Sequence, residues 1–490
     1  MTPAMHFESN WASLQQYVCP DWFRDAKFGI WAHWGPQCVP EAGDWYARHM
    51  YVEGHPQYAH HLDHYGHPSE HGYKDLIPLW TCEHFDADAL MTKYKAAGAR
   101  YFVSMGVHHD NYDLWNSQHH RWNAVNHGPR RDIVGAWRDA ARHHGLRFGV
   151  TEHLERAYSW FNTNKGHDQS GPKAGVPYDG LTPGFEDLYF PPHDDTNRQY
   201  PIDPPAWWCQ QWADRINDLV EQYDPDLLYT DGAIPFGEVG RGVLADFYNR
   251  NVARRDGRLE AVFNLKSYKQ STKADAKPGR TAEAGGHGEY VEGIGTLDLE
   301  RGGVDRIWPE PWQTDTCIGG WFYDREREYK SPQLVVHMLA DIVSKNGNLL
   351  LNFPGRADGT LDDRALAILD ALAHWFAING EAIYDTRPWS RYGQGNDIPT
   401  GDFAEPKESP LGFGDYRFTT KGPALYAIAM DWPDAGGTWQ IEDVADRAVG
   451  RVELLGVDGP LTFDRTGDTI TITPPTRRPS SDLAYGLKLT

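Results

Sequence analysis

Short apolar runs alternate with amphipathic stretches between about residues 20 and 385. Six runs have the length and composition of buried strands: 27–34, 101–106, 146–151, 226–231, 261–266 and 348–353. Apolar residues recur every three or four positions over 86–98, 131–145, 208–223 and 331–347, which predicts helices with one buried face. Gly145 and Gly347 stand where a glycine that ends a helix is expected.

Repeated alternation of strands and helices predicts a parallel sheet covered by helices. The length of this region favours a (β/α)8-like barrel (TIM barrel) with inserted loops over residues 1–385. A doubly wound nucleotide-binding sheet is disfavoured, because no glycine-rich loop follows the first strand candidate at 27–34.

The pattern changes after residue 385. Residues 416–430, 450–456, 459–475 and 483–490 are short alternating segments separated by Gly, Asp and Pro, and 469–473 reads Thr-Ile-Thr-Ile-Thr. A strict period of two predicts half-buried antiparallel strands. We therefore expect a C-terminal antiparallel β-sandwich over residues 386–490, with residues 389–412 as a linker or long loop.

Polar side chains stand at the ends of several predicted strands. Barrel active sites form at the carboxyl ends of the strands, so these positions are expected to meet at one face. They are His33, His108, His109, Asp110, Glu152, His153, Asp231 and Asn352. A single polar residue at a strand end is often a hydrogen-bonded residue of the core. Eight of them are hard to explain by packing, so the pattern indicates a functional site.

Composition narrows the function. The formal charge of −22, from 69 acidic and 47 basic residues, disfavours nucleic acid as a partner. No apolar run reaches the length of a membrane span, and the start lacks the features of a signal peptide. The default expectation is a cytoplasmic protein, or a periplasmic or secreted one if a leader has been removed. The 20 Trp and 25 Tyr fit sugar recognition and a large aromatic core equally well.

Two chemistries suit the predicted site. Histidines and carboxylates at strand ends bind metals in barrel hydrolases, with His108, His109 and Asp231 as candidate ligands. Against a metal, the first strand offers only His33, and adjacent His108 and His109 would point to opposite faces of a strand.

The other chemistry is cleavage of a glycosidic bond by two carboxyl groups. One ionised carboxylate traps the oxocarbenium-like carbon, and one protonated acid serves the leaving oxygen. Asp231 suits the first role, because a rigid strand end fixes it. The acid is expected in residues 268–312, where no strand is predicted, and spacing does not choose among Glu283, Glu289, Glu292, Glu300 and Glu310.

Several segments resemble, in order, those of glycoside hydrolase family 29, the α-L-fucosidases. They are WFRDAKFGIWAHWG (22–35), GDWYARHMY (43–51), ARYFVSMGVHHDNYDLWNS (99–117), DLLYTDG (226–232), PWQTDTCIGGWFY (311–323) and IVSKNGNLLLNFPGRADGTL (342–361). The resemblance implies a retaining exo-glycosidase that needs no metal or other cofactor, acting on terminal α-L-fucose of an oligosaccharide or glycoconjugate.

The resemblance also assigns roles. Asp231 matches the nucleophile, and Glu300, shortly before PWQTDT, is favoured as the acid/base over Glu283. The residues expected to hydrogen-bond the sugar hydroxyls are His33, His108 and His109, and those expected to pack on the sugar are Trp45 and Trp321.

Three departures from the family pattern bear on the sugar. Asp44 replaces a common Glu, which shortens its reach toward the sugar hydroxyls, and the Lys before the paired histidines is missing. Glu152 and His153 replace a Tyr-rich segment and are expected to contact a different hydroxyl or substituent. A related sugar such as α-L-galactose is therefore the alternative substrate. A metal-dependent hydrolase and a non-catalytic sugar-binding protein are more distant alternatives, and a homo-oligomer is left open.

Overall fold

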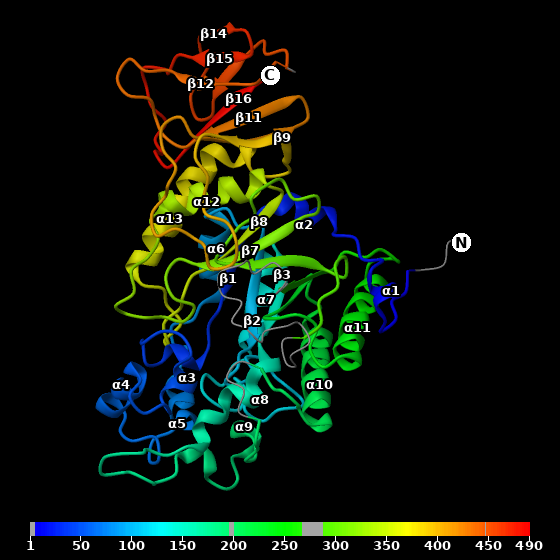
Figure 1. The fold of residues 1–490 in the computed structure, drawn as a ribbon, viewed down its shortest axis with the longest axis vertical. Coiled ribbons are helices and arrows are strands. Elements are labelled where there is room, and N and C mark those ends of the chain that lie inside the picture. The colour runs from blue at the N-terminus through cyan, green and yellow to red at the C-terminus, as the bar shows by residue number, and fades with distance from the viewer. Residues whose placement is uncertain (1–4, 196–199, 267–287, 446) are drawn as a thin grey trace.

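The computed structural model describes residues 5–195, 200–266, 288–445 and 447–490, and its main body is a closed barrel of parallel strands (Figure 1). Each strand pairs with the next along the chain, and the last pairs with the first. The strands are β1 (Phe28–Ala32), β2 (Tyr101–Val107), β3 (Arg147–Glu152), β4 (Leu227–Thr230), β5 (Val262–Lys266), β6 (Thr296–Glu300), β7 (Trp312–Cys317) and β8 (Gly347–Asn352). The expected (β/α)8-like barrel is confirmed.

Large side chains fill the inside of the barrel. Trp31, Tyr101, Tyr229 and Leu350 belong to one buried cluster there. Gly29 of β1 lies opposite Tyr101 of β2, and a Cβ atom at position 29 would come within 2.4 Å of the Tyr101 ring. Glycine at this position therefore makes room for an aromatic ring in the core.

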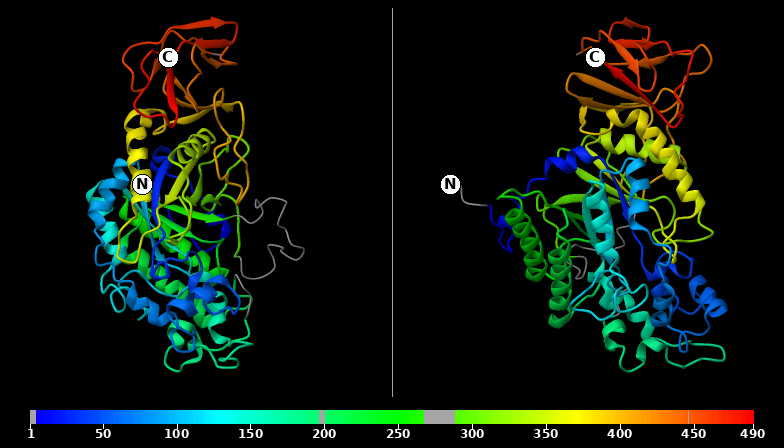
Figure 2. Two further views of the ribbon diagram at one scale, coloured as in Figure 1. Left: turned by 90° about the vertical axis from the view of Figure 1, so that its left-hand side faces the viewer. Right: turned by 180° about the vertical axis from the view of Figure 1, so that it is seen from behind.

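Helices lie around the barrel and beyond its end that faces away from the C-terminal sheets (Figures 1 and 2). They are α1 (Trp11–Leu14), α2 (Asp21–Ala26), α3 (Tyr46–His49), α4 (Pro56–His64), α5 (Tyr73–Leu76), α6 (Ala87–Ala96), α7 (Ile133–His143), α8 (Ala157–Trp160), α9 (Glu186–Tyr189), α10 (Ala206–Tyr223), α11 (Glu238–Arg254), α12 (Pro332–Ser344) and α13 (Asp363–Asn379). The four predicted helices are α6, α7, α10 and α12. Across the described ranges, no helix has the length and apolarity to cross a membrane.

Three of the four predicted helices begin at a side-chain cap, and α10, which follows Pro205, does not. Asp86, Asp132 and Ser331 accept hydrogen bonds from the first-turn amides of α6, α7 and α12. Gly145 follows α7 with φ of 72°, as predicted. After α12 the left-handed residue is Asn346, with φ of 72°, and Gly347 already begins β8. The expectation for Gly347 was therefore wrong.

Strands β6 and β7 contradict one expectation. Residues 268–312 were expected to hold no strand, yet β6 lies there, and β7 begins at Trp312, the last residue of that range. Both strands carry polar residues at inward positions, of which Asp298, Gln313 and Asp315 are buried and Glu300 is partly buried. A hydrophobic pattern does not detect a strand whose inward face is polar.

The C-terminal part is a sandwich of two antiparallel sheets. One sheet has the order β13-β16-β11-β10-β9 and the other β12-β15-β14. The strands are β9 (Arg387–Gln394), β10 (Tyr416–Lys421), β11 (Ala424–Ala429), β12 (Trp439–Ile441), β13 (Val452–Leu454), β14 (Phe463–Thr466), β15 (Thr469–Ile472) and β16 (Tyr485–Leu489). Phe418 and Leu487 of the first sheet share a core with Trp439 and Ile470 of the second. The expected β-sandwich is confirmed, although β9 occupies the start of the predicted linker.

Candidate active site

Asp231 follows β4 directly and is buried, with 8% of its surface exposed. Its main-chain N–H donates to the carbonyl of Glu152 at 3.2 Å, which extends the β3–β4 pairing by one residue. Its side chain meets polar groups from three other strand ends and their loops. The carboxylate is therefore fixed at the mouth of the barrel, as the sequence predicts.

Two cations hold the Asp231 carboxylate. The Lys266 ammonium lies 2.8 Å from Oδ1, and the Arg156 guanidinium lies 3.1 Å from Oδ2. Arg156 also donates to the main-chain oxygen of Asp231 at 2.9 Å. Burial raises the pKa of Asp231, but the charges of Arg156 and Lys266 outweigh burial and hold the pKa well below its usual value. Asp231 is thus an ionised carboxylate across the physiological range.

Glu300, the last residue of β6, shares Lys266 with Asp231. Its Oε2 lies 2.5 Å from the Lys266 ammonium, and its Oε1 accepts a hydrogen bond of 3.2 Å from the indole of Trp321. Burial raises the pKa of Glu300, the nearby Lys266 lowers it, and the net change is upward. The site therefore holds one carboxyl group with a depressed pKa and one with a raised pKa, both in contact with the same ammonium. Glu283, the other expected acid, lies outside the described residues.

Four histidines line the site next to Asp231. The centroid of the His108 ring lies 5.0 Å from that of His33, 4.2 Å from that of His109 and 5.1 Å from that of His153. Gln37 fixes His108 through a contact of 2.8 Å to Nδ1. Burial keeps the pKa values of His33, His108 and His109 well below normal, so these rings are neutral. Neutral imidazoles offer both a donor and an acceptor, which suits sugar hydroxyls.

His109 and His153 also face the Asp231 carboxylate. The distances to Oδ2 are 3.6 Å from Nε2 of His109 and 3.4 Å from Nδ1 of His153. His108 and His109 were expected to point to opposite faces, yet both rings lie at the site. Strand β2 ends at Val107, so the alternation of side chains no longer applies to the two histidines.

Aromatic residues complete the lining. Trp321 packs 5.2 Å from Trp31 and 5.4 Å from His33 between ring centroids. Trp45 packs edge-on to His109 at 6.1 Å. Asp44 instead accepts a hydrogen bond of 2.7 Å from the main-chain N–H of Phe322, so one of its oxygens already holds the Trp321 loop in place.

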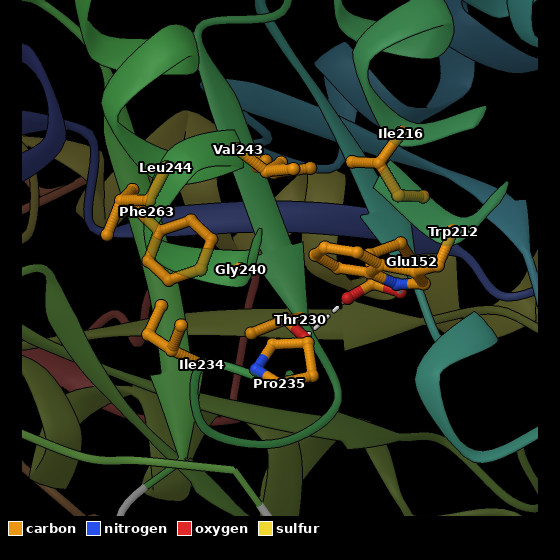
Figure 3. Close-up of a pocket in the computed structure, with 11 residues that line it drawn as sticks. Glu152, Trp212, Ile216, Thr230, Ile234, Pro235, Gly240, Val243, Leu244 and Phe263 are labelled. Carbon is orange, nitrogen blue, oxygen red and sulfur yellow. Dashed lines mark hydrogen bonds between the residues drawn. The ribbon is translucent and has the colours of Figure 1, made fainter. Parts of the chain in front are cut away.

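Glu152 lies on the other side of the barrel wall. Figure 3 shows its carboxylate among Trp212, Thr230 and apolar side chains of α10 and α11. It accepts hydrogen bonds from Thr230 at 2.6 Å, Trp212 at 3.0 Å and the N–H of Leu154 at 3.0 Å. Glu152 is not brought to the face of the barrel wall that holds Asp231, and its three donors give it a structural place between β3, β4 and α10.

Three groups of described side chains could hold a metal ion, and two of them lie among the histidines of the site; the third is the largely exposed group Asp88, His143 and His144. His33, His108 and His153 form one group, and His109, His153 and Asp231 another, with ligand atoms within 4.8 Å of one another. In the second group, Asp231 already carries Lys266 and Arg156, whose positive charges compete with a cation. The arrangement therefore suits a carboxylate held for chemistry on a sugar better than a metal ligand.

Sequence reasoning did not select three polar residues of the site. Lys266 ends β5 and Arg156 lies just beyond β3, where the rule that identified His33 and Asp231 applies equally. The third, Asp315, points inward from β7, where it accepts a hydrogen bond of 3.2 Å from Tyr229 and lies 4.0 Å from Lys266. It was missed because β7 itself was not predicted.

Both the barrel and the C-terminal β-sandwich of this chain are similar to known proteins. Residues 2–381 match the family model for alpha-L-fucosidase, and residues 414–490 match that for the alpha-L-fucosidase C-terminal domain. Plasma alpha-L-fucosidase of Pongo abelii is 29% identical over 469 residues, covering 94% of this chain and 87% of the relative. Tissue alpha-L-fucosidase of Homo sapiens is 26% identical over 506 residues, covering 100% and 92%.

Solved structures agree with these matches. A crystal structure of Thermotoga maritima alpha-fucosidase in complex with fucose superposes with a TM-score of 0.73 at 25% identity, covering 99% of this chain and 100% of that one. The alpha-L-fucosidase isoenzyme 1 from Paenibacillus thiaminolyticus gives a TM-score of 0.65 at 20% identity, with 96% and 98% covered. The order of segments, the barrel with its β-sandwich and the family models agree, and the chain belongs to the α-L-fucosidase family, glycoside hydrolase family 29.

Proposed function

We propose that this protein hydrolyses terminal α-L-fucosides by double displacement, with Asp231 as nucleophile and Glu300 as acid/base. Asp231 attacks the anomeric carbon while Glu300 protonates the leaving oxygen, which gives a β-linked fucosyl-enzyme. Glu300 then removes a proton from water as the water attacks the same carbon. Two inversions return the α configuration in the released sugar.

The observation that carries this proposal is the shared ammonium of Lys266. Its Nζ lies 2.8 Å from Oδ1 of Asp231 and 2.5 Å from Oε2 of Glu300. The distance between these two carboxylate oxygens therefore cannot exceed the sum of the two contact distances. Retaining glycosidases place their carboxyl groups roughly 5–5.5 Å apart, whereas inverting enzymes need roughly 6.5–9.5 Å to admit a water. The spacing supports the retaining mechanism.

The histidines and Trp321 support a sugar bound between the two carboxyl groups. His33, His108 and His153 offer hydrogen-bonding nitrogens on one side. Among the described residues, the buried Nδ1 of His33 and Nε2 of His153 find no hydrogen-bond partner. Trp321 offers an apolar face next to the acid. A small apolar pocket selects for the methyl group of fucose only modestly, by about 1–3 kcal/mol.

A panel of aryl glycosides tests the sugar. We expect the α-L-fucoside to be hydrolysed at least about tenfold faster, by kcat/KM, than the α-L-galactoside, because galactose carries a hydroxyl group on the carbon that is only a methyl group in fucose. The β-D-galactoside and β-D-fucoside should be inert. A preference for the α-L-galactoside would assign that sugar instead, and activity abolished by a chelator would favour the metal-dependent alternative.

Arg156 should set the acidic limit of activity. Replacing it by Met removes a charge that lowers the pKa of Asp231, and activity requires Asp231 to be ionised. Activity is lost as pH falls through that pKa, so Arg156→Met should move the acidic limb of the kcat/KM profile upward by about one to three pH units. Arg156→Lys keeps the charge and should move it less. An unchanged acidic limb in Arg156→Met would contradict this electrostatic role.

A further inference from the structure

The chain between β9 and β10 leaves the C-terminal sandwich and returns to the barrel (Figures 1 and 2). In this return segment, residues 400–405, the N–H of Phe403 donates to the carbonyl of Glu300 at 2.8 Å, and Gly401 donates to Gly303 at 2.8 Å. Glu405 donates to Arg301 at 2.9 Å in the same way. The segment is thus paired to the residues that end β6 and follow it.

The two backbones lie so close together that there is no room for a side chain at position 302. A Cβ atom at Gly302 would lie 1.8 Å from the carbonyl oxygen of Gly401, so the two backbones touch there. Glycine at position 302 permits this contact, because any other residue would push the return segment away from the end of β6.

Charges anchor the far end of the return segment. The Glu405 carboxylate, with 11% of its side chain exposed, lies 2.9 Å from Lys330 and 3.2 Å from Arg301. It also accepts a hydrogen bond of 2.6 Å from Thr316 of β7. Partly buried, multiply bonded carboxylates hold their backbone firmly. The return segment is therefore fixed to the barrel rather than loosely draped over it.

Two side chains of the return segment lie between these anchors. Asp402 is partly buried, and burial together with Glu300 and Asp315 raises its pKa to about 6, with Lys266 opposing. Its carboxyl group is thus within electrostatic reach of the proposed acid. Phe403 is 66% exposed although its backbone is bonded to Glu300. A large aromatic ring in water, on a residue whose main chain is bonded to the last residue of β6, is available to a ligand.

We propose that Phe403, with Asp402 beside it, forms the subsite for the sugar that leaves when fucose is cleaved. This inference rests on the proposed function. The acid/base touches the oxygen that joins fucose to the next sugar, and the fucose ring occupies the side of the histidines and Asp231. The next sugar therefore lies past Glu300, where the return segment is bonded. Phe403 packs on an apolar face of that pyranose, and Asp402 accepts a hydrogen bond from one of its hydroxyls.

Two substrates separate this subsite from the fucose site. In α-L-fucosyl fluoride the leaving group is a single atom that does not reach Phe403. The second substrate is the best hydrolysed member of a panel of α-L-fucosyl disaccharides that covers the linkages to galactose and N-acetylglucosamine. In Phe403→Ala, the ratio of kcat/KM for the disaccharide to kcat/KM for the fluoride should fall about tenfold, the size expected for one aromatic packing contact.

Phe413→Ala is the matched control, because Phe413 is also exposed, at 52%, and also lies between β9 and β10. It should leave the ratio as in wild type. Equal losses on both substrates in Phe403→Ala, or an unchanged ratio, would overturn the subsite. So would a change of oligomeric state in Phe403→Ala by sedimentation, which would assign the ring to a contact between copies of the chain. A wild-type protein inactive on the fluoride would instead overturn the proposed function, and the subsite with it.

Discussion

Asp231→Gly should lower kcat/KM for an aryl α-L-fucoside by a factor of about 10⁴ or more, the scale seen when a covalent nucleophile is removed. The loss follows from the position of the carboxylate, because no other described carboxyl group contacts both Lys266 and Arg156 and could replace it. Circular dichroism should show an intact fold, since glycine leaves the β3–β4 pairing in place.

Azide gives this experiment a second readout. In Asp231→Gly the added anion takes the place of the missing carboxylate and attacks from the same face, so the product is β-L-fucosyl azide. Activity that persists near wild type, or rescue that yields the α-azide, would show that Asp231 is not the nucleophile.

Glu300→Ala should depend on the leaving group. A disaccharide needs a proton at the glycosidic oxygen and should lose about 10²–10⁴ in kcat/KM, whereas a dinitrophenyl fucoside should lose far less. Azide then intercepts the β-linked fucosyl-enzyme and yields α-L-fucosyl azide, the opposite anomer to that from Asp231→Gly. Equal losses on both substrates would move the acid role to Glu283 or another residue.

The pH profile tests the same assignment. Glu300 must be protonated in the first step, so kcat/KM falls as pH rises through its pKa, which burial raises above the usual value for Glu. The basic limb should therefore be present in wild type and absent in Glu300→Gln. A basic limb that survives in Glu300→Gln would assign it to another group.

The sequence predicts those barrel strands whose side chains are mainly apolar and buried. Strands such as 226–231 and 348–353 were recognised because their apolar runs are buried on both faces. Strands β6 and β7 were not, because Asp298 and Asp315 point into the barrel and hide the pattern. The interior of this barrel is polar near its mouth, where the chemistry takes place.

The sequence could have predicted that Glu152 does not face the site. It pairs in register with Thr230, the neighbour of Asp231. Paired residues of adjacent strands share a face, so if Asp231 points inward, Thr230 and Glu152 point outward. Alternation alone therefore separates Glu152 from His153. The return segment was beyond sequence reasoning, because its contact with Glu300 joins positions about a hundred residues apart without any local signal.

In the proposed mechanism, Lys266 is a constant electrostatic partner throughout the catalytic cycle. Before reaction, Asp231 would carry the negative charge and Glu300 the proton; in the proposed fucosyl-enzyme, Asp231 would be a neutral ester and Glu300 would be ionised. The pair therefore carries a single negative charge in both states, and the charge only moves from one neighbour of the ammonium to the other. A fixed cation that contacts both positions needs little rearrangement of its surroundings as the charge moves, which lowers the reorganisation energy of both chemical steps.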